Sequence, residues 1–159
     1  MAHIARRLPP ELLPEALELT RRVFLEFEGP DYPPEGVEEF LRFLEDRETL
    51  AGLAFWGSFL EGKLTGVLAA REGHICLLFV DRDHHRQGAA RALVEAYTAG
   101  CPGPVTVNSS PYGAEAYRRL GFVDTDGMQF VNGMYFIPMK REGQAQCDLV
   151  TEEKSTAEV

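Results

Sequence analysis

The stretch ICLLFVDRDHHRQGAARAL, residues 75–93, decides the fold of this chain and its chemistry. Its first six residues, Ile75–Val80, are apolar and too few to span a membrane, which predicts a buried strand. A polar loop at 81–85 follows, and from Arg86 the sequence enters helical spacing. This order of strand, glycine-containing loop and helix start directs backbone N–H groups and the positive end of a helix dipole at one place. The sequence therefore predicts a site for a pyrophosphate-bearing ligand.

The residues around Gly88 suit a bound phosphate group. Gly88 lets the backbone come close to a ligand, and the small side chains of Ala89 and Ala90 leave space beside it. Arg86 and Arg91 add positive charge. The alternative interpretation is an ordinary strand-to-helix turn with a capping glycine. The chain has neither a GxxxxGK[ST] loop nor a GxGxxG run after a strand, which argues against nucleoside triphosphatases and dinucleotide-binding folds.

The composition indicates one globular domain. The chain has 159 residues, 45% hydrophobic and 26% charged, enough to bury a core. The first ten residues contain no apolar signal-peptide core, and the longest uncharged run, 50–60, is too short to cross a bilayer. Three cysteines without a CxxC motif favour a reducing cytoplasm. No His, Cys and carboxylate spacing predicts a metal site.

The charge distribution is uneven. A net charge of −9 argues against a nucleic-acid partner. Between 26 and 48 the sequence holds nine acids against two bases, whereas the loop at 85–91 is basic. Such a separation would suit a cationic acceptor at one end of a cleft and an anionic cofactor at the other. Alternatively, most of these acids simply solvate helix faces.

Hydrophobic periodicity predicts the other elements along the chain. They are a short strand at 3–7, helices at 10–28 and 35–48, a strand hairpin of 50–60 and 63–71, a helix at 87–100, a strand at 105–107, a helix at 111–120 and a final hairpin of 128–131 and 134–139. Asn132-Gly133 is a strong hairpin-turn signal. Residues 1–140 are therefore expected to form a single domain, and the acidic segment 141–159 a disordered tail.

Two motifs in this order resemble the GNAT superfamily of acyl-CoA N-acyltransferases. His85-Arg86-Gln87-Gly88-Ala89-Ala90 is similar to its pyrophosphate loop, Arg/Gln-x-x-Gly-x-Gly/Ala, with His at the first position. The segment NSSPYGAEAYRRLGF, residues 108–122, resembles its second cofactor motif. The order of elements over 3–139 also matches that of the superfamily. The segment VFLEFEGPDYPPEGVEEFLRFL, residues 23–44, resembles a group of small bacterial acetyltransferases. The resemblance implies an α/β fold with a central, mostly antiparallel mixed sheet, a splayed strand pair and flanking helices.

The same resemblance implies acetyl-CoA as cofactor and assigns residues to it. The N–H of Leu78 would polarise the thioester carbonyl, Val80 and Asn108 would hold the pantetheine arm, and Tyr117 would protonate the departing thiolate. The implied cofactor-binding residues are Leu78, Val80, His85, Arg86, Gln87, Gly88, Ala89, Ala90, Arg91, Asn108 and Tyr117. The alternatives are a fully paired core strand at 75–80, a helix cap at Asn108 and a core aromatic at Tyr117.

The catalytic base and the acceptor pocket are less well defined by the sequence. His74, at the start of the central strand, corresponds to the position of the base in some family members, and its ordinary pKa suits that role. It could equally lie in an exposed turn. The resemblance assigns Asp31 and Tyr32, between the first two helices, to the acceptor pocket; the alternative is a simple loop break.

The resemblance implies an N-acetyltransferase, and the cysteine usage favours a cytoplasmic one. Its expected acceptor is a primary amine, either a small molecule or a peptide, with no nucleic-acid or membrane partner. A homodimer is a further expectation, because dimers are common in the superfamily. The competing hypothesis is a non-catalytic acyl-CoA-binding sensor, and O-acyl transfer or a longer acyl donor is a third.

Overall fold

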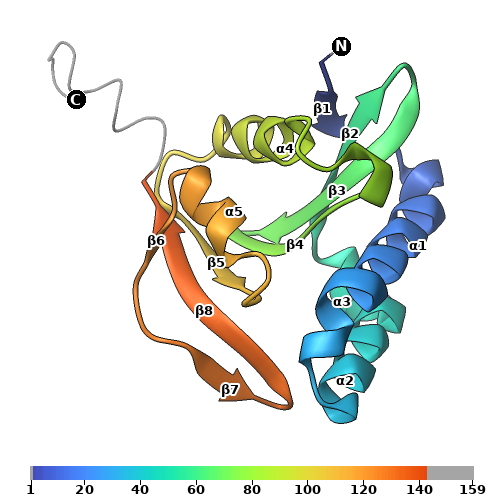
Figure 1. Ribbon diagram of the computed structural model, residues 1–159. Coiled ribbons are helices and arrows are strands. Elements are labelled where there is room, and N and C mark those ends of the chain that lie inside the picture. The colour runs from blue at the N-terminus through green and yellow to red at the C-terminus, as the bar shows by residue number, and fades with distance from the viewer. Residues whose placement is uncertain (1, 143–159) are drawn as a thin grey trace, which may run out of the picture.

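The structure is a computed structural model in which residues 2–142 are described, so nearly all of the predicted tail lies outside the described residues. Figure 1 shows the elements, which are β1 (Ile4–Arg7), α1 (Leu13–Val23), α2 (Pro34–Glu45), α3 (Arg47–Ala51), β2 (Ala54–Leu60), β3 (Lys63–Arg71), β4 (His74–Val80), α4 (Ala89–Thr98), β5 (Val105–Ser109), α5 (Ala114–Arg119), β6 (Val123–Asp124), β7 (Gln129–Val131) and β8 (Met134–Arg141). No helix in this part of the chain is long and apolar enough to cross a membrane. Nor do its side chains form a group that could hold a metal ion.

The strands form one sheet in the order β1-β2-β3-β4-β5-β8-β6, with β7 paired to β8. Only β4 and β5 run parallel, so the sheet is mixed and mostly antiparallel, as expected. Seven consecutive residues of β3 are buried because helices cover both faces of the sheet. Val67 and Ala69 pack with α1 and α2 on one face, and Leu68 and Ala70 pack with α4 and α5 on the other.

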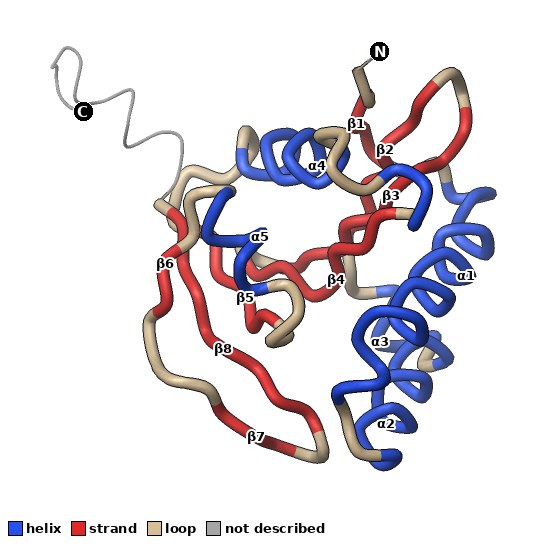
Figure 2. The backbone as a smooth tube through the Cα atoms, viewed as in Figure 1, coloured by secondary structure: helices blue, strands red, loops and turns tan. Residues whose placement is uncertain are grey.

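The predicted splay between β4 and β5 is present. The two strands pair only at His74 with Thr106 and at Ile75 with Val107. Beyond this point β4 pairs only with β3, whereas β5 continues along β8 as far as Ser109. The alternative of a fully paired strand at 75–80 is therefore wrong. Figure 2 lets the reader follow both strands as they separate beside α5.

Several predicted boundaries shift for local reasons. The predicted helix at 10–28 consists of a 3-10 turn, α1 and a π-helical turn over Phe24–Glu28. The second helix stops at Glu45, and Asp46 accepts a hydrogen bond from the Thr49 N–H at 3.2 Å to start α3. Strand β2 therefore begins four residues later than predicted, at Ala54. The two-residue strand β6 was not predicted.

The turn between β7 and β8 packs directly on the start of α2. A Cβ atom on Gly36 would collide with the carbonyl oxygen of Gly133, so the two backbones meet without side chains between them. Gly133 also has a φ of +80°, which favours glycine in this turn. The contact fixes the first residues of β8 beside the segment that joins α1 to α2, and this segment forms one wall of the cleft described next.

Candidate active site

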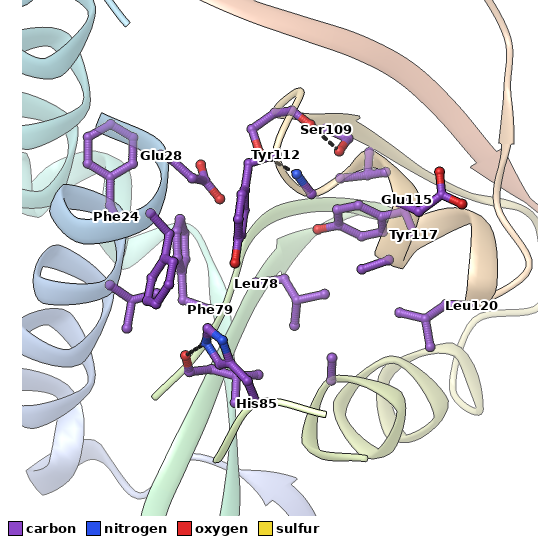
Figure 3. Close-up of a pocket in the computed structure, with 18 of the residues that line it drawn as sticks. Phe24, Glu28, Leu78, Phe79, His85, Ser109, Tyr112, Glu115, Tyr117 and Leu120 are labelled. Carbon is purple, nitrogen blue, oxygen red and sulfur yellow. Dashed lines mark hydrogen bonds between the residues drawn. The ribbon is translucent and has the colours of Figure 1, made fainter. Parts of the chain in front are cut away.

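The splay between β4 and β5 opens into a cleft with a volume of about 1310 Å³. Its lining comes from the end of α1, from β4, from the loop before α4, from the β5–α5 segment and from the start of β8. Figure 3 shows Phe24 and Glu28 on the α1 side, Leu120 on the side of α4 and α5, and Tyr112 between them. The cleft therefore joins the predicted phosphate loop to the segment between the first two helices.

The backbone of β4 presents donors to this cleft. Asp81 N–H bonds the Thr65 carbonyl at 2.8 Å, which fixes the phase of the antiparallel ladder. Because the hydrogen-bonding direction alternates along a strand, the N–H groups of Leu78 and Val80 face away from β3. Both residues line the cleft. These N–H groups therefore point to the side from which β5 has diverged.

The loop before α4 exposes the start of that helix to the cleft. Arg86 and Gly88 have φ values of 63° and 89°, both in the left-handed region. The first intrahelical hydrogen bond runs from Ala92 N–H to the Gly88 carbonyl, and no side chain caps the helix. The N–H groups just before Ala92 thus have no intrahelical acceptor. A Cβ on Gly88 would meet nothing within 4 Å, so the backbone faces open space suited to an anion.

The side chains of the loop have different surroundings. The His85 Nε2–H donates to the Val80 carbonyl at 2.8 Å, so this histidine ties the loop to β4. Arg91 lines the cleft and donates to the Arg119 carbonyl at 3.1 Å. Gln87 instead bonds His3 at 3.1 Å and is not among the lining residues. The side chain of Gln87 is thus held by His3, and the assignment of Gln87 to cofactor binding stays a prediction.

Tyr117 and Asn108 both line the cleft. Tyr117 is buried, and Figure 3 shows its hydroxyl pointing into the cleft rather than into the core. Burial, and then the charge of Glu28, raise the pKa of this phenol well above its usual range. Tyr117 is therefore a neutral hydrogen-bond donor. Asn108 stands where the strands have separated and borders a second, smaller cavity as well.

The most perturbed carboxyl group in the cleft belongs to Glu28, which the sequence analysis did not single out. Burial raises its pKa to about 7, a Ser110 hydrogen bond lowers it and the charge of Asp31 raises it. The π-helical turn over Phe24–Glu28 carries this side chain into the cleft. One signal was available: Glu28 follows Phe24 by four residues, so a charged residue falls on the apolar stripe of the predicted helix.

Of the remaining predicted site residues, one lines the cleft and two do not. Tyr32 lines the cleft, and its hydroxyl donates to the Tyr135 carbonyl at 3.2 Å. Asp31 is exposed and does not line the cleft. His74 lies 2.8 Å (Nδ1 to Oγ1) from Thr106 and borders the smaller cavity, of about 290 Å³, instead of the cleft. Burial, then the charge of Arg71, lower the pKa of His74.

Glu28→Gln should stabilise the folded protein at alkaline pH. The pKa of Glu28 in the folded protein, about 7, exceeds its ordinary value of 4.5, so folding favours the protonated form, and the free energy of unfolding falls as pH rises through this interval. Glutamine cannot ionise, so it removes the roughly 3 kcal/mol by which the charged Glu28 carboxylate lowers the free energy of unfolding at pH 8. Chemical denaturation of both proteins at pH 4 and pH 8 measures this difference in the free energy of unfolding. The variant should match the wild type at pH 4 and exceed it at pH 8, whereas Glu38→Gln, at an exposed position outside the cleft, should show no such change.

Comparisons with known proteins agree with this arrangement. Residues 28–142 match the family model described as the acetyltransferase (GNAT) domain. A search of curated proteins finds no significant match.

Among solved structures, the chain is similar to a GCN5-related N-acetyltransferase from Rhodopseudomonas palustris, with a TM-score of 0.77, 19% identity, and coverage of 89% of this chain and 96% of that one. It is also similar to the PaiA N-acetyltransferase from Thermoplasma acidophilum in complex with coenzyme A (TM-score 0.68, 19% identity, coverage 89% and 99%). An aminoglycoside 6'-N-acetyltransferase complexed with coenzyme A is a third (TM-score 0.62, 12% identity, coverage 87% and 96%). At these identities the likeness concerns the fold.

Proposed function

This chain belongs to the GNAT acetyltransferase family and is an acyltransferase, and from that premise we propose that it transfers an acetyl group from acetyl-CoA to a primary amine. The observation that carries the proposal is the direction of the Leu78 and Val80 N–H groups, which face a cleft with an anion site at one end and Glu28 at the other. The structural neighbours in complex with coenzyme A support the choice of donor.

The anion site at the start of α4 would hold the pyrophosphate of the donor. The backbone N–H groups of Gly88, Ala89 and Ala90 supply donors there, and Arg86 and Arg91 line the same part of the cleft. From that end the pantetheine arm would follow β4, with the Val80 N–H as a donor to its amides. The thioester oxygen would then lie near the Leu78 N–H, which would stabilise the negative charge that develops there by a few kcal/mol.

We assign the role of base to Glu28 in place of His74, because Glu28 lines the cleft and His74 does not. An amine enters mostly as an ammonium ion, and the Glu28 carboxylate accepts one of its protons. The neutral nitrogen then bonds to the thioester carbon, the carbon–sulfur bond breaks, and the nitrogen releases its surplus proton to solvent as the amide forms. Glu28 returns its own proton to solvent before the next turnover. Tyr117, kept neutral by its raised pKa, donates its proton to the departing thiolate and regains one from solvent.

Tyr117→Phe should reduce kcat roughly 100-fold or more while the Kd for coenzyme A stays within about twofold. Steady-state turnover and calorimetric titration with coenzyme A measure the two effects separately. Tyr97→Phe makes the same change at a phenol outside the cleft and should leave kcat nearly unchanged. An unchanged kcat in Tyr117→Phe would contradict the assignment of the acid, and absence of acetyl-CoA binding by the wild type would contradict the proposed donor.

Two further parts of the proposal rest on sequence arguments. We place the protein in the cytoplasm because of its cysteine usage; Cys76 and Cys101 are free thiols. We also retain the prediction of a homodimer. Equilibrium sedimentation of the full chain tests the second expectation.

A further inference from the structure

We propose that the acceptor is a small amine with one positive charge and an aromatic or otherwise apolar body. This proposal rests on the proposed function, since it specifies what enters the part of the cleft that the donor leaves free. The donor would occupy the region from α4 along β4 to Tyr117. The region beyond, between the end of α1 and the start of β8, would then receive the acceptor (Figure 3).

The walls of this acceptor region are aromatic. Its side chains come from the end of α1, the link to α2, α2 itself, β4, the β5–α5 loop and the start of β8: Phe24, Phe27, Tyr32, Phe40, Phe79, Tyr112, Met134, Tyr135 and Phe136. Phe24 stacks on Phe40 at 3.9 Å between ring centroids, and Tyr32 stacks between Phe24 and Tyr135 at 5.9 and 6.4 Å. Such a surface gains free energy by covering an apolar or aromatic body, and it offers few polar partners to a sugar or a polyamine.

Among the described residues, 2–142, Glu28 is the one carboxylate that lines this acceptor region. Of the nine acids between 26 and 48, only Glu28 lines the cleft; Glu39 borders the smaller cavity. The other acidic residue of the cleft, Glu115, lies on α5 beside the donor region. Seven of the other eight acids are exposed and none of the eight lines the cleft, which agrees with the alternative that most of them solvate helix faces. A single carboxylate within an aromatic box matches one ammonium group, which also interacts favourably with ring faces.

The start of β8 and the link between α1 and α2 border the region on the side away from the donor. The Tyr32 hydroxyl bonds the Tyr135 carbonyl at 3.2 Å, and the Gly36–Gly133 backbone contact holds the β7–β8 turn against α2. A polycation would find Glu28 as its carboxylate partner in this region, and its further charges would lie against aromatic rings or outside the cleft. A compact amine would place its nitrogen at Glu28 and its apolar body against the rings.

The experiment compares kcat/KM at saturating acetyl-CoA for three amines: 2-phenylethylamine, ethylamine and spermidine. Release of coenzyme A is the readout, and mass spectrometry identifies the acetylated product. We expect 2-phenylethylamine to exceed ethylamine by roughly 100-fold, since one methylene in an apolar pocket already changes kcat/KM by about 10-fold or more. It should exceed spermidine as well.

Tyr135→Ala provides the structural test, because it removes a ring of the wall and keeps the carbonyl that Tyr32 uses. It should lower the ratio of kcat/KM for 2-phenylethylamine over ethylamine roughly tenfold. Val131→Ala, at an exposed position of the same hairpin and outside the cleft, should leave that ratio unchanged.

The outcomes distinguish failure of the proposed acceptor class from failure of the proposed acetyltransferase function. If kcat/KM for spermidine or ethylamine equals or exceeds that for 2-phenylethylamine, the proposed acceptor class is wrong, whereas the proposed acetylation of amines stands. If the ratio survives Tyr135→Ala, the aromatic wall does not select the acceptor. If acetyl-CoA binds and no amine is acetylated, the proposed function fails, and the acceptor class fails with it.

Discussion

Glu28→Gln should lower kcat/KM for the acceptor amine by roughly 10²- to 10⁴-fold, the contribution of a positioned general base. Glutamine keeps the size of the side chain and its capacity to bond Ser110, but it cannot accept a proton at neutral pH. The loss should appear in kcat, because the variant lacks the base, and also in a raised KM, because it lacks the carboxylate that would pair with the ammonium group of the acceptor. Glu38→Gln is the matched control, since it makes the same substitution at an exposed residue outside the cleft.

The pH profile gives this prediction a second readout. Because burial raises the pKa of Glu28 to about 7, only part of the wild-type enzyme holds the base unprotonated at neutral pH. Log kcat/KM should therefore rise as pH passes through about 7 and then flatten, apart from the ionisation of the amine itself. In Glu28→Gln the rise near 7 should be absent. A variant that keeps both the wild-type rate and this rise would exclude Glu28 as the base and return attention to His74.

The fold could be predicted from the sequence to a large extent because its signals are local. The apolar run of β3, the Asn132-Gly133 turn and the helical spacing after Gly88 each depend on a few neighbouring residues. Boundaries were less certain where two elements compete for the same residues. The break at Asp46 depends on one side-chain hydrogen bond, and β6 depends on pairing with β8, which is distant in the sequence.

The residues of the candidate cleft were predictable where the backbone conformation or the family resemblance indicates them, as at Gly88, Asn108 and Tyr117. The anion site needs a positive φ at Gly88 and an uncapped helix start, and both follow from sequence. The role of Glu28 depends on burial, which arises when α1, the β5–α5 loop and β8 meet, and no local pattern encodes that meeting. His74 illustrates the reverse case: its position in the strand was predicted correctly, yet pairing with Thr106 places it outside the cleft.

Gly88→Asp should weaken the binding of acetyl-CoA and of free coenzyme A roughly 100-fold or more. Two effects combine. A Cβ at this position would extend into the open space of the anion site, and the added carboxylate would repel a pyrophosphate by about 4 kcal/mol at 4 Å separation near a protein surface. The positive φ of 89° adds strain of about 1 kcal/mol for a residue other than glycine.

A matched variant separates repulsion from strain. Gly62 has a φ of +83° in the β2–β3 turn, and a Cβ there would also meet nothing within 4 Å, yet it does not line the cleft. Gly62→Asp therefore introduces the same charge and a similar backbone strain away from the anion site, and it should bind coenzyme A as the wild type does. Calorimetric titration of the three proteins, with thermal melts to check folding, makes the comparison. Equal affinities for Gly88→Asp and Gly62→Asp would show that the start of α4 does not hold the pyrophosphate, and the donor would then need a different orientation in the cleft.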